Sequence, residues 1–173
     1  VMGDKIVGHN TDGTGLVRDI TTNLGWQIES KRVLIIGAGG ACRGAILPLL
    51  NQSPVSITIA NRTASRAQAL IDQFEHPALI ACGLDEIDAP FDVIINASSG
   101  GLSGDVPDIS AMIFSETAAA YDMVYGKGKT VFQHWAQSNG AQATADGLGM
   151  LVEQAAESFM IWRGVRPSTK TVL

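Results

Sequence analysis

Two kinds of apolar segment alternate along this chain. Short runs rich in β-branched and small residues occupy 33–36, 55–59, 78–82, 93–95, 119–124 and, more weakly, 141–144. Most of these runs are too short for helices. Several are apolar at consecutive positions, which is typical of strands that are buried on both faces of a parallel sheet. The pattern therefore predicts six strands.

Helical periodicity fills the segments between these runs. Over 64–74, apolar side chains recur at the i, i+3, i+4 and i+7 spacing of one helix face, and Thr63 stands where an N-terminal cap belongs. Further helices are predicted at 11–24, 40–52, 130–139 and 148–162. Thr11 or Asp12 is expected to cap the first of them. Pro48 falls inside the second, where it should remove a backbone hydrogen bond and kink the helix.

The regular alternation of strands and helices specifies the fold class. Repeated βαβ units are typical of α/β proteins, in which helices cover a parallel sheet. We therefore predict a Rossmann-type, doubly wound fold with a mainly parallel six-stranded sheet and helices on both faces. Glycine-rich segments at 98–104 and 125–129 are predicted to be loops.

Composition narrows the class of protein. The chain has 173 residues, of which 46% are hydrophobic and 17% charged, so it suits one folded domain rather than a disordered chain. Its net charge of −5 disfavours nucleic acid and anionic membranes as partners. No apolar stretch approaches the ~20 residues that cross a bilayer, and the first residues do not resemble a secretory signal. Two cysteines imply no disulfide framework, so we expect a cytoplasmic protein.

The sharpest local motif is a glycine-rich loop that follows the first predicted strand and opens a helix. Its sequence is Gly-Ala-Gly-Gly-Ala-Cys-Arg-Gly over 37–44. In a βαβ unit, Gly37 would permit the tight turn, and Gly39 would let a pyrophosphate approach the backbone and the free N–H groups of the helix. Cys42 replaces the usual third glycine. Its place at a helix N-terminus would favour a reactive thiolate, but packing is the preferred interpretation because the position requires a small side chain.

The end of the second strand indicates which dinucleotide is bound. NAD-binding units place an acid there to accept hydrogen bonds from the ribose hydroxyls. This chain has Asn61, Arg62 and Thr63, with Arg66 one turn further on. The two guanidinium groups suit a 2′-phosphate, and cations at the positive end of a helix are otherwise unfavourable. These residues therefore predict NADP rather than NAD.

Other polar residues are ambiguous when each is taken alone. Asp12 is explained equally well by a helix cap, Gln154 by a surface position and Met150 by core packing. His9, His76 and His134 are scattered without metal-ligand spacing, so no metal site is predicted.

In combination, the motifs resemble those of shikimate dehydrogenases almost from end to end. The matching segments, in the order found in that family, are Asn10-Thr11-Asp12-Gly13, Gly37-Ala38-Gly39-Gly40-Ala41, Asn61-Arg62-Thr63 with Arg66, Ile95-Asn96-Ala97-Ser98, Tyr121-Asp122-Met123 with Tyr125, and Asp146-Gly147-Leu148-Gly149-Met150 with Gln154. Six motifs in one order are far more specific than any single motif.

The resemblance implies an oxidoreductase that reduces 3-dehydroshikimate to shikimate with NADPH, on the chorismate pathway to aromatic amino acids. It places the cofactor against Gly37, Ala38, Gly39, Gly40, Ala41, Asn61, Arg62, Thr63, Arg66, Ala97, Ser98, Met123, Gly147 and Met150. Within this set, Asn61 to Arg66 would hold the 2′-phosphate, while Met123 and Gly147 would line the nicotinamide. The substrate would meet Asp12, Tyr125 and Gln154, and Asp12 would also be half of a catalytic Lys/Asp pair.

The same resemblance implies a separate N-terminal substrate domain that carries the catalytic lysine. Residues 1–24 are then expected to be a linker and connecting helix from that domain, and 25–146 the NADP-binding domain. The C-terminal helix, in 147–173, is expected to pack toward the substrate domain. On this hypothesis the chain alone binds NADP with little or no turnover. If the protein forms an oligomer, a homodimer is expected.

Three alternatives stay open from the sequence. An NAD-preferring quinate/shikimate dehydrogenase would be closely related, but an acid would be expected near the end of the second strand. A glutamyl-tRNA reductase would share the glycine loop and Asn-Arg-Thr, yet would leave the clusters at 10–13 and 146–150 unexplained. A non-catalytic NADP-sensing module would need no lysine, but it would give Asp12, Tyr125 and Gln154 no substrate to bind.

Overall fold

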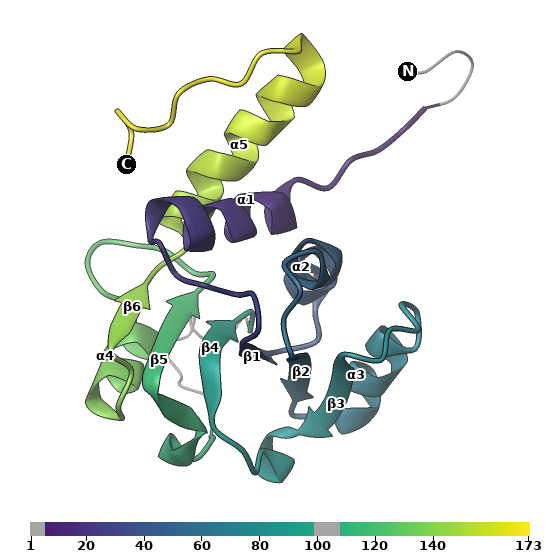
Figure 1. Ribbon diagram of the computed structural model, residues 1–173, viewed down its shortest axis with the longest axis vertical. Coiled ribbons are helices and arrows are strands. Elements are labelled where there is room, and N and C mark those ends of the chain that lie inside the picture. The colour runs from purple at the N-terminus through teal and green to yellow at the C-terminus, as the bar shows by residue number, and fades with distance from the viewer. Residues whose placement is uncertain (1–5, 99–107) are drawn as a thin grey trace.

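One parallel sheet organises the protein, whose computed structural model describes residues 6–98 and 108–173 (Figure 1). The first five residues and most of the predicted 98–104 loop therefore lie outside the described residues. The strands are β1 (Arg32–Ile36), β2 (Ser56–Asn61), β3 (Leu79–Gly83), β4 (Phe91–Asn96), β5 (Phe114–Asp122) and β6 (Ala143–Ala145). They pair in the order β3-β2-β1-β4-β5-β6, with every pair parallel. The predicted Rossmann-type sheet is confirmed. Its order reverses between β1 and β4, and ligands bind at the carboxyl edge of such a reversal.

The helices occur where the periodicity predicted them. They are α1 (Asp12–Arg18), continued by the π-helical turn η1 (Asp19–Asn23), then α2 (Gly40–Leu50), α3 (Ala64–Ile71), α4 (Val131–Ser138) and α5 (Leu148–Arg163). Two 3-10 turns, η2 (Leu84–Glu86) and η4 (Ala111–Ile113), complete the regular structure of these residues. Pro48 does not end α2, which continues past it to Leu50. In the part of the chain described, no helix combines the length and apolarity that crossing a membrane requires.

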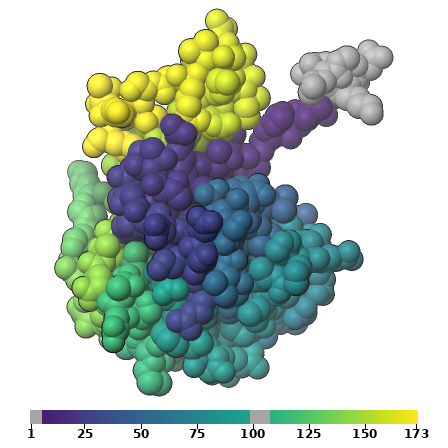
Figure 2. Space-filling model, in the orientation of Figure 1, coloured from purple at the N-terminus to yellow at the C-terminus, as the bar shows by residue number. Residues whose placement is uncertain are grey.

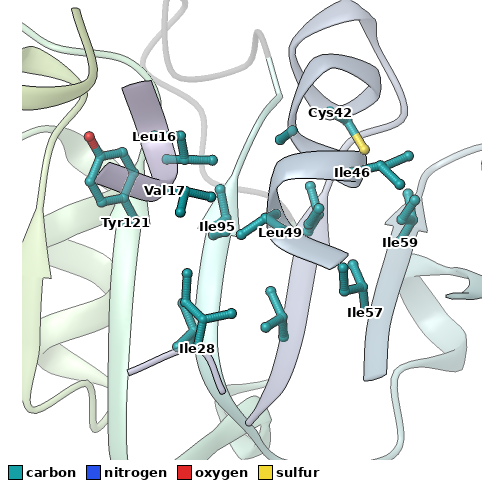
Figure 3. Packing of buried hydrophobic residues seen from close by; sticks show 14 of the residues in the cluster. Leu16, Val17, Ile28, Cys42, Ile46, Leu49, Ile57, Ile59, Ile95 and Tyr121 are labelled. Atoms are coloured by element: carbon teal, nitrogen blue, oxygen red, sulfur yellow. The ribbon is translucent and has the colours of Figure 1, made fainter. Parts of the chain in front are cut away.

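Two apolar layers, one on each face of the sheet, form the core. Alternate residues of β1 face opposite layers: Val33 and Ile35 join α1, α2 and α3, whereas Leu34 and Ile36 join α4 and η4. Figure 3 shows the first layer, with side chains of α1 and α2 meeting those of the strands. Each fully buried aliphatic side chain contributes about 1.5–3 kcal/mol to folding. The continuously apolar strands therefore arise because helices cover both faces of the sheet.

The predicted helix caps are wrong for two helices. Thr11 and Thr63 occupy the N-cap positions of α1 and α3, but neither side chain accepts a hydrogen bond from its helix. The N–H of Asp12 instead donates to Oδ1 of Asn10 over 2.9 Å. Thr11 is buried, and its hydroxyl bonds to side chains of α5. A tertiary partner has replaced the local one.

Two glycines let α1 lie between two other helices. Because successive helical residues are about 100° apart, Gly13 and Gly15 lie on roughly opposite faces of α1. A Cβ on Gly13 would clash with the carbonyl oxygen of Gly44 in α2, which Pro48 leaves without its usual helical donor. A Cβ on Gly15 would lie 2.6 Å from the backbone nitrogen of Gln154 in α5. The backbone of α1 therefore approaches both neighbours as closely as glycine allows.

The C-terminal helix α5 is attached to the rest of the protein mainly through α1 and η1. In Figure 2 this helix and the tail after it, in yellow, stand above α1, in purple. Glu153 of α5 is 1% exposed and forms ion pairs with Arg18 (2.9 Å) and Arg166 (2.8 Å). It also accepts hydrogen bonds from Asn23 over 3.2 Å and Thr169 over 2.7 Å. One carboxylate thus joins α1, η1, α5 and the C-terminal tail.

These contacts determine the charge state of Glu153. Burial by itself raises the pKa of this carboxyl, but the donors Thr169, Arg166 and Asn23 and the charge of Arg18 outweigh it, so the pKa lies below its ordinary value. A folded-state pKa that is lowered stabilises the fold above the pKa of the unfolded chain. That stabilisation is lost as the pH falls through the folded-state pKa.

Replacing Gly13 with alanine should destabilise the protein. Alanine is intrinsically about 1 kcal/mol better than glycine inside a helix, yet its methyl group would push α1 away from α2. We expect a net loss of about 1–3 kcal/mol in the free energy of unfolding, measured by urea denaturation. Gly8→Ala is the matched control, because a Cβ there meets no atom within 4 Å in the part of the chain that the structure describes. Equal stability of Gly13→Ala and wild type would contradict the close packing described.

Replacing Glu153 with glutamine should cost about 1–3 kcal/mol of stability at pH 7, since the ion pairs are lost while the shape is kept. The difference between wild type and Glu153→Gln should narrow below about pH 4.3, the ordinary pKa of glutamate, as the wild-type carboxylate is protonated. Denaturation series from pH 7 to pH 3 measure both effects. A difference that stays constant across this range would show that the charge of Glu153 contributes nothing.

Candidate functional site

The site is built at the carboxyl edge of the sheet, beginning with the turn after β1. Gly37 has a φ of +106°, a conformation that side chains with a Cβ rarely adopt. A Cβ there would also lie 3.1 Å from the carbonyl of Ala97 and from the nitrogen of Ser98. Ala97 continues the ladder by donating to the oxygen of Ile36 over 2.9 Å. The structure therefore brings the predicted residues of the glycine loop beside Ala97 and Ser98.

The start of α2 is open. Among residues 6–98 and 108–173, no atom beyond the adjoining backbone lies within 4 Å of a Cβ built on Gly39 or Gly40, so a ligand could approach the backbone closely there. Gly40, Ala41 and Cys42 are the first three residues of α2, whose N–H groups have no acceptor within the helix. The first helical bond runs from Arg43 to the oxygen of Gly39. Open space, free donors and the positive end of the helix dipole fit a phosphate group.

Cys42 is a packing residue, as preferred from the sequence. Its side chain is completely buried in the layer between α2 and the sheet. Burial raises the pKa of its thiol to about 12, so the thiolate is scarcely populated at neutral pH. The position of the missing third glycine is thus filled by a small, inert side chain.

The second strand ends in a polar turn that is attached to the glycine loop. Oδ1 of Asn61 accepts a hydrogen bond from the N–H of Ala38 over 3.3 Å, and its Nδ2 donates to the oxygen of Thr63 over 2.9 Å. Arg62 and Arg66 are exposed beside this turn. Neither pairs with an acidic side chain among residues 6–98 and 108–173. Two guanidinium groups without acidic partners in that part of the chain therefore lie on the turn that Asn61 attaches to the glycine loop.

A buried network that the sequence analysis did not assign stabilises the same edge. Asn96 and Asp122 end the neighbouring strands β4 and β5 and are register partners. Nδ2 of Asn96 donates to Oδ1 of Asp122 over 3.0 Å, and Oδ1 of Asn96 accepts from the hydroxyl of Ser98 over 2.7 Å. Oδ2 of Asp122 accepts from the hydroxyl of Thr130, which begins α4. The network fixes the loop that underlies Gly37.

Asp122 is completely buried, and this burial raises the pKa of its carboxyl above the ordinary value. Hydrogen bonds from Thr130, Val124 and Asn96 partly offset the desolvation. A signal for this network exists in the sequence, because Asn96 immediately follows the apolar run 93–95 and Asp122 is the one charged residue within the run 119–124. Adjacent parallel strands place their last residues side by side, but the sequence alone does not give the order of the strands.

The third region lies where β5 meets the start of α5. A Cβ on Gly147 would clash with the carbonyl oxygen of Met123, so these two predicted residues are in direct contact. The hydroxyl of Tyr121 donates to Asp19 over 2.7 Å and accepts from the N–H of Met150 over 3.3 Å. Burial and the charge of Asp19 raise the pKa of Tyr121 far above its ordinary value, so it stays neutral. The phenol thereby joins η1, β5 and the first turn of α5.

The predicted substrate residues lie around the contact between α1 and α5. Thr11, next to Asp12, bonds to Oε1 of Gln154 over 3.2 Å. Asp12 is half-buried and Tyr125 is half-exposed on the segment that follows β5. In the described part of the chain, no hydrogen bond or ion pair joins Asp12 or Tyr125 directly to Gln154. The fold brings Thr11 and Gln154 together and leaves Tyr125 on the adjoining loop.

Within the residues described, no group of three or more His, Cys, Asp and Glu side chains has the geometry to hold a metal ion. The chemistry of this edge rests instead on backbone donors, guanidinium groups and side-chain amides. Such an edge suits an anionic organic ligand better than a divalent cation.

Comparisons with known proteins place this geometry among related enzymes. The family model for shikimate / quinate 5-dehydrogenase matches residues 18–102, and the model for the shikimate 5′-dehydrogenase C-terminal domain matches residues 147–173. The chain is similar to the shikimate dehydrogenase (NADP(+)) of Alcanivorax borkumensis, with 54% identity. That match covers 99% of this chain and 63% of the relative, so the chain spans less than two thirds of its length.

Solved structures of related proteins are similar to this chain in fold as well as in sequence. The chain is similar to an Ael1 enzyme from Pseudomonas putida, with 47% identity and a TM-score of 0.89, over 94% of this chain and 60% of that one. It is also similar to shikimate 5-dehydrogenase from Thermus thermophilus in complex with NADP(H) and shikimate, with 31% identity and a TM-score of 0.79. That match again covers 94% of this chain and 60% of the other.

Proposed function

This chain belongs to the shikimate and quinate dehydrogenase family, and we propose that it supplies the NADP-binding part of a shikimate dehydrogenase. The observation that carries the proposal is the polar turn after β2, where Arg62 and Arg66 lack acidic partners in the described part of the chain. Arginine binds phosphate bidentately, so this turn suits the 2′-phosphate that distinguishes NADP from NAD. An NAD-preferring relative would be expected to carry an acid there.

The remaining parts of the cofactor follow from this placement. The pyrophosphate would lie on the first turn of α2, where Gly39 and Gly40 leave the backbone open. Ala97 and Ser98 would contact the cofactor where it extends from α2 toward β4. Met123, Gly147 and Met150 would line the nicotinamide. When bound, the nicotinamide supplies a hydride to the carbonyl carbon of 3-dehydroshikimate or removes one from shikimate. Met123 and Gly147, which contact each other, would hold that ring.

Asp12, Tyr125 and Gln154 would bind the substrate beside this ring. Reduction of a ketone requires that the carbonyl oxygen receive a proton as the hydride arrives at carbon. By family resemblance, that proton comes from a lysine whose charge Asp12 sets, in a region that precedes the Asn10 motif. The exposed apolar side chains of α5, including Leu151, Phe159 and Trp162, form a surface suited to cover such a region. We therefore propose that residues 147–173 pack toward a substrate domain.

Removing one guanidinium should abolish the cofactor preference. In Arg62→Ala we expect the affinity for NADPH to fall about 10- to 100-fold, as for loss of a charge-assisted hydrogen bond, with no change for NADH. Titration of the purified chain, followed by the fluorescence of the reduced nicotinamide, measures both affinities. Arg163→Ala is the matched control, because it removes an exposed charge at the far end of α5. Equal affinities of the wild type for NADPH and NADH would refute the assignment.

The purified chain should bind NADPH but oxidise shikimate slowly or not at all, because the lysine of the catalytic pair would lie outside it. Absorbance of NADPH at saturating shikimate and NADP+ measures this turnover. The full polypeptide encoded by the gene provides the comparison and should be active. Rapid turnover by the chain alone would contradict the proposed division into two domains.

A further inference from the structure

We infer that Thr11 and Ser158 are positioning residues that fix the side-chain amide of Gln154 so that it offers an N–H donor to the substrate. The inference rests on the proposed function, in which Gln154 binds substrate. It goes beyond that function because it assigns a direction to the hydrogen bond and a role to Ser158. Neither residue need touch the substrate itself.

The three side chains form one hydrogen-bonded chain across the interface of α1 and α5. Oγ1 of Thr11 lies 3.2 Å from Oε1 of Gln154 and 3.0 Å from Oγ of Ser158. Gln154 and Ser158 are four residues apart in α5, so they lie on the same face of that helix. Thr11 is only 9% exposed, so water has little access to compete for its hydrogen bonds. These three side chains, called the relay below, are therefore part of the interface between α1 and α5.

The orientation of the Gln154 amide follows from its second partner. Its Nε2 lies 3.0 Å from the carbonyl oxygen of Leu151. A carbonyl oxygen only accepts hydrogen bonds, so the nitrogen of the amide must face Leu151 and the oxygen must face Thr11. If the amide were rotated by half a turn, its oxygen would face the carbonyl oxygen of Leu151, and neither atom could donate a hydrogen bond. The local chemistry thus selects one of the two orientations.

The direction of the other bonds then follows. Because the amide oxygen faces Thr11, the single hydroxyl proton of Thr11 must be donated to Gln154. The bond between Thr11 and Ser158 therefore uses the proton of Ser158, with Thr11 accepting. In this chain of hydrogen bonds, Ser158 therefore donates to Thr11 and Thr11 donates to Gln154. Among the residues described, the second N–H of Gln154 has no acceptor and stays available to a ligand.

A close helix contact holds this relay in register. Gly15 lies one turn after Thr11, on the same face of α1, and its missing side chain lets α1 reach the backbone of Gln154. The neighbouring Asp12 carboxylate accepts hydrogen bonds, whereas the oriented Gln154 donates one. A hydroxyl both donates and accepts hydrogen bonds, so a substrate alcohol could bond to either group.

Steady-state kinetics of the full polypeptide encoded by the gene test the inference. For Thr11→Val we expect the KM for shikimate to rise about five- to tenfold, and for Ser158→Ala about two- to fourfold, as for loss of one hydrogen bond. The kcat should change less than about twofold, and the KM for NADP+ should not change. Thr11→Ser keeps the hydroxyl and should restore the wild-type KM. Thr21→Val is the matched control, because among residues 6–98 and 108–173 the Thr21 hydroxyl bonds to the backbone oxygen of Val17 and to no side chain.

The outcomes separate this inference from the proposed function. An inactive wild type would refute the proposed function. An active wild type whose KM for shikimate is unchanged in both Thr11→Val and Ser158→Ala would overturn the positioning role. Equal rises in the KM for shikimate and for NADP+ would also overturn it, because they would indicate a displaced helix. If Thr11→Val fails to fold, Ser158→Ala decides the matter, since Ser158 is only half-buried.

Discussion

The close approach of α1 to its two neighbours is the constraint on which the site depends. Gly13 and Gly15 remove side chains from opposite faces of one helix, and this lets α2 and α5 pack against the same two turns. The helix α2 carries the glycine loop, whereas α5 carries Gln154. Their relative position is thus fixed by one intervening backbone rather than by a loop. Two segments more than a hundred residues apart are held against one helix for this reason.

Buried polar groups then determine the relative orientation of these elements. An apolar contact tolerates sliding, but a buried hydrogen bond is lost when its partners separate, and the cost of the unpaired group resists such movement. Tyr121 and Glu153 act in this way at the two ends of the contact between α1, η1 and α5. Asp122 does the same between β4 and the start of α4. Although few residues of the chain are charged, carboxyl groups such as those of Glu153 and Asp122 lie at the contacts between its helices and strands.

Sequence patterning predicted the elements and the glycine loop because period and turn chemistry are local properties. Residues 33–36 are apolar at every position since helices cover both faces of the sheet, and Gly37 is required by its own φ. The caps at Thr11 and Thr63 were mispredicted because the sequence gives a cap position but not a competing partner. Ser158 and Asp122 gain their partners through helix contact and strand order. Those partners are not encoded in neighbouring residues.

The acidic character of the whole chain does not argue against an anionic dinucleotide. At physiological ionic strength, charges on the surface are screened over about 8 Å, so distant carboxylates act weakly on a phosphate at the edge of the sheet. The groups nearest to the proposed phosphate position are instead the free N–H groups of α2 and the guanidinium groups of Arg62 and Arg66. The first turn of α3 contains no acid that would neutralise them. A net charge of −5 and a cationic phosphate site are therefore compatible within one domain.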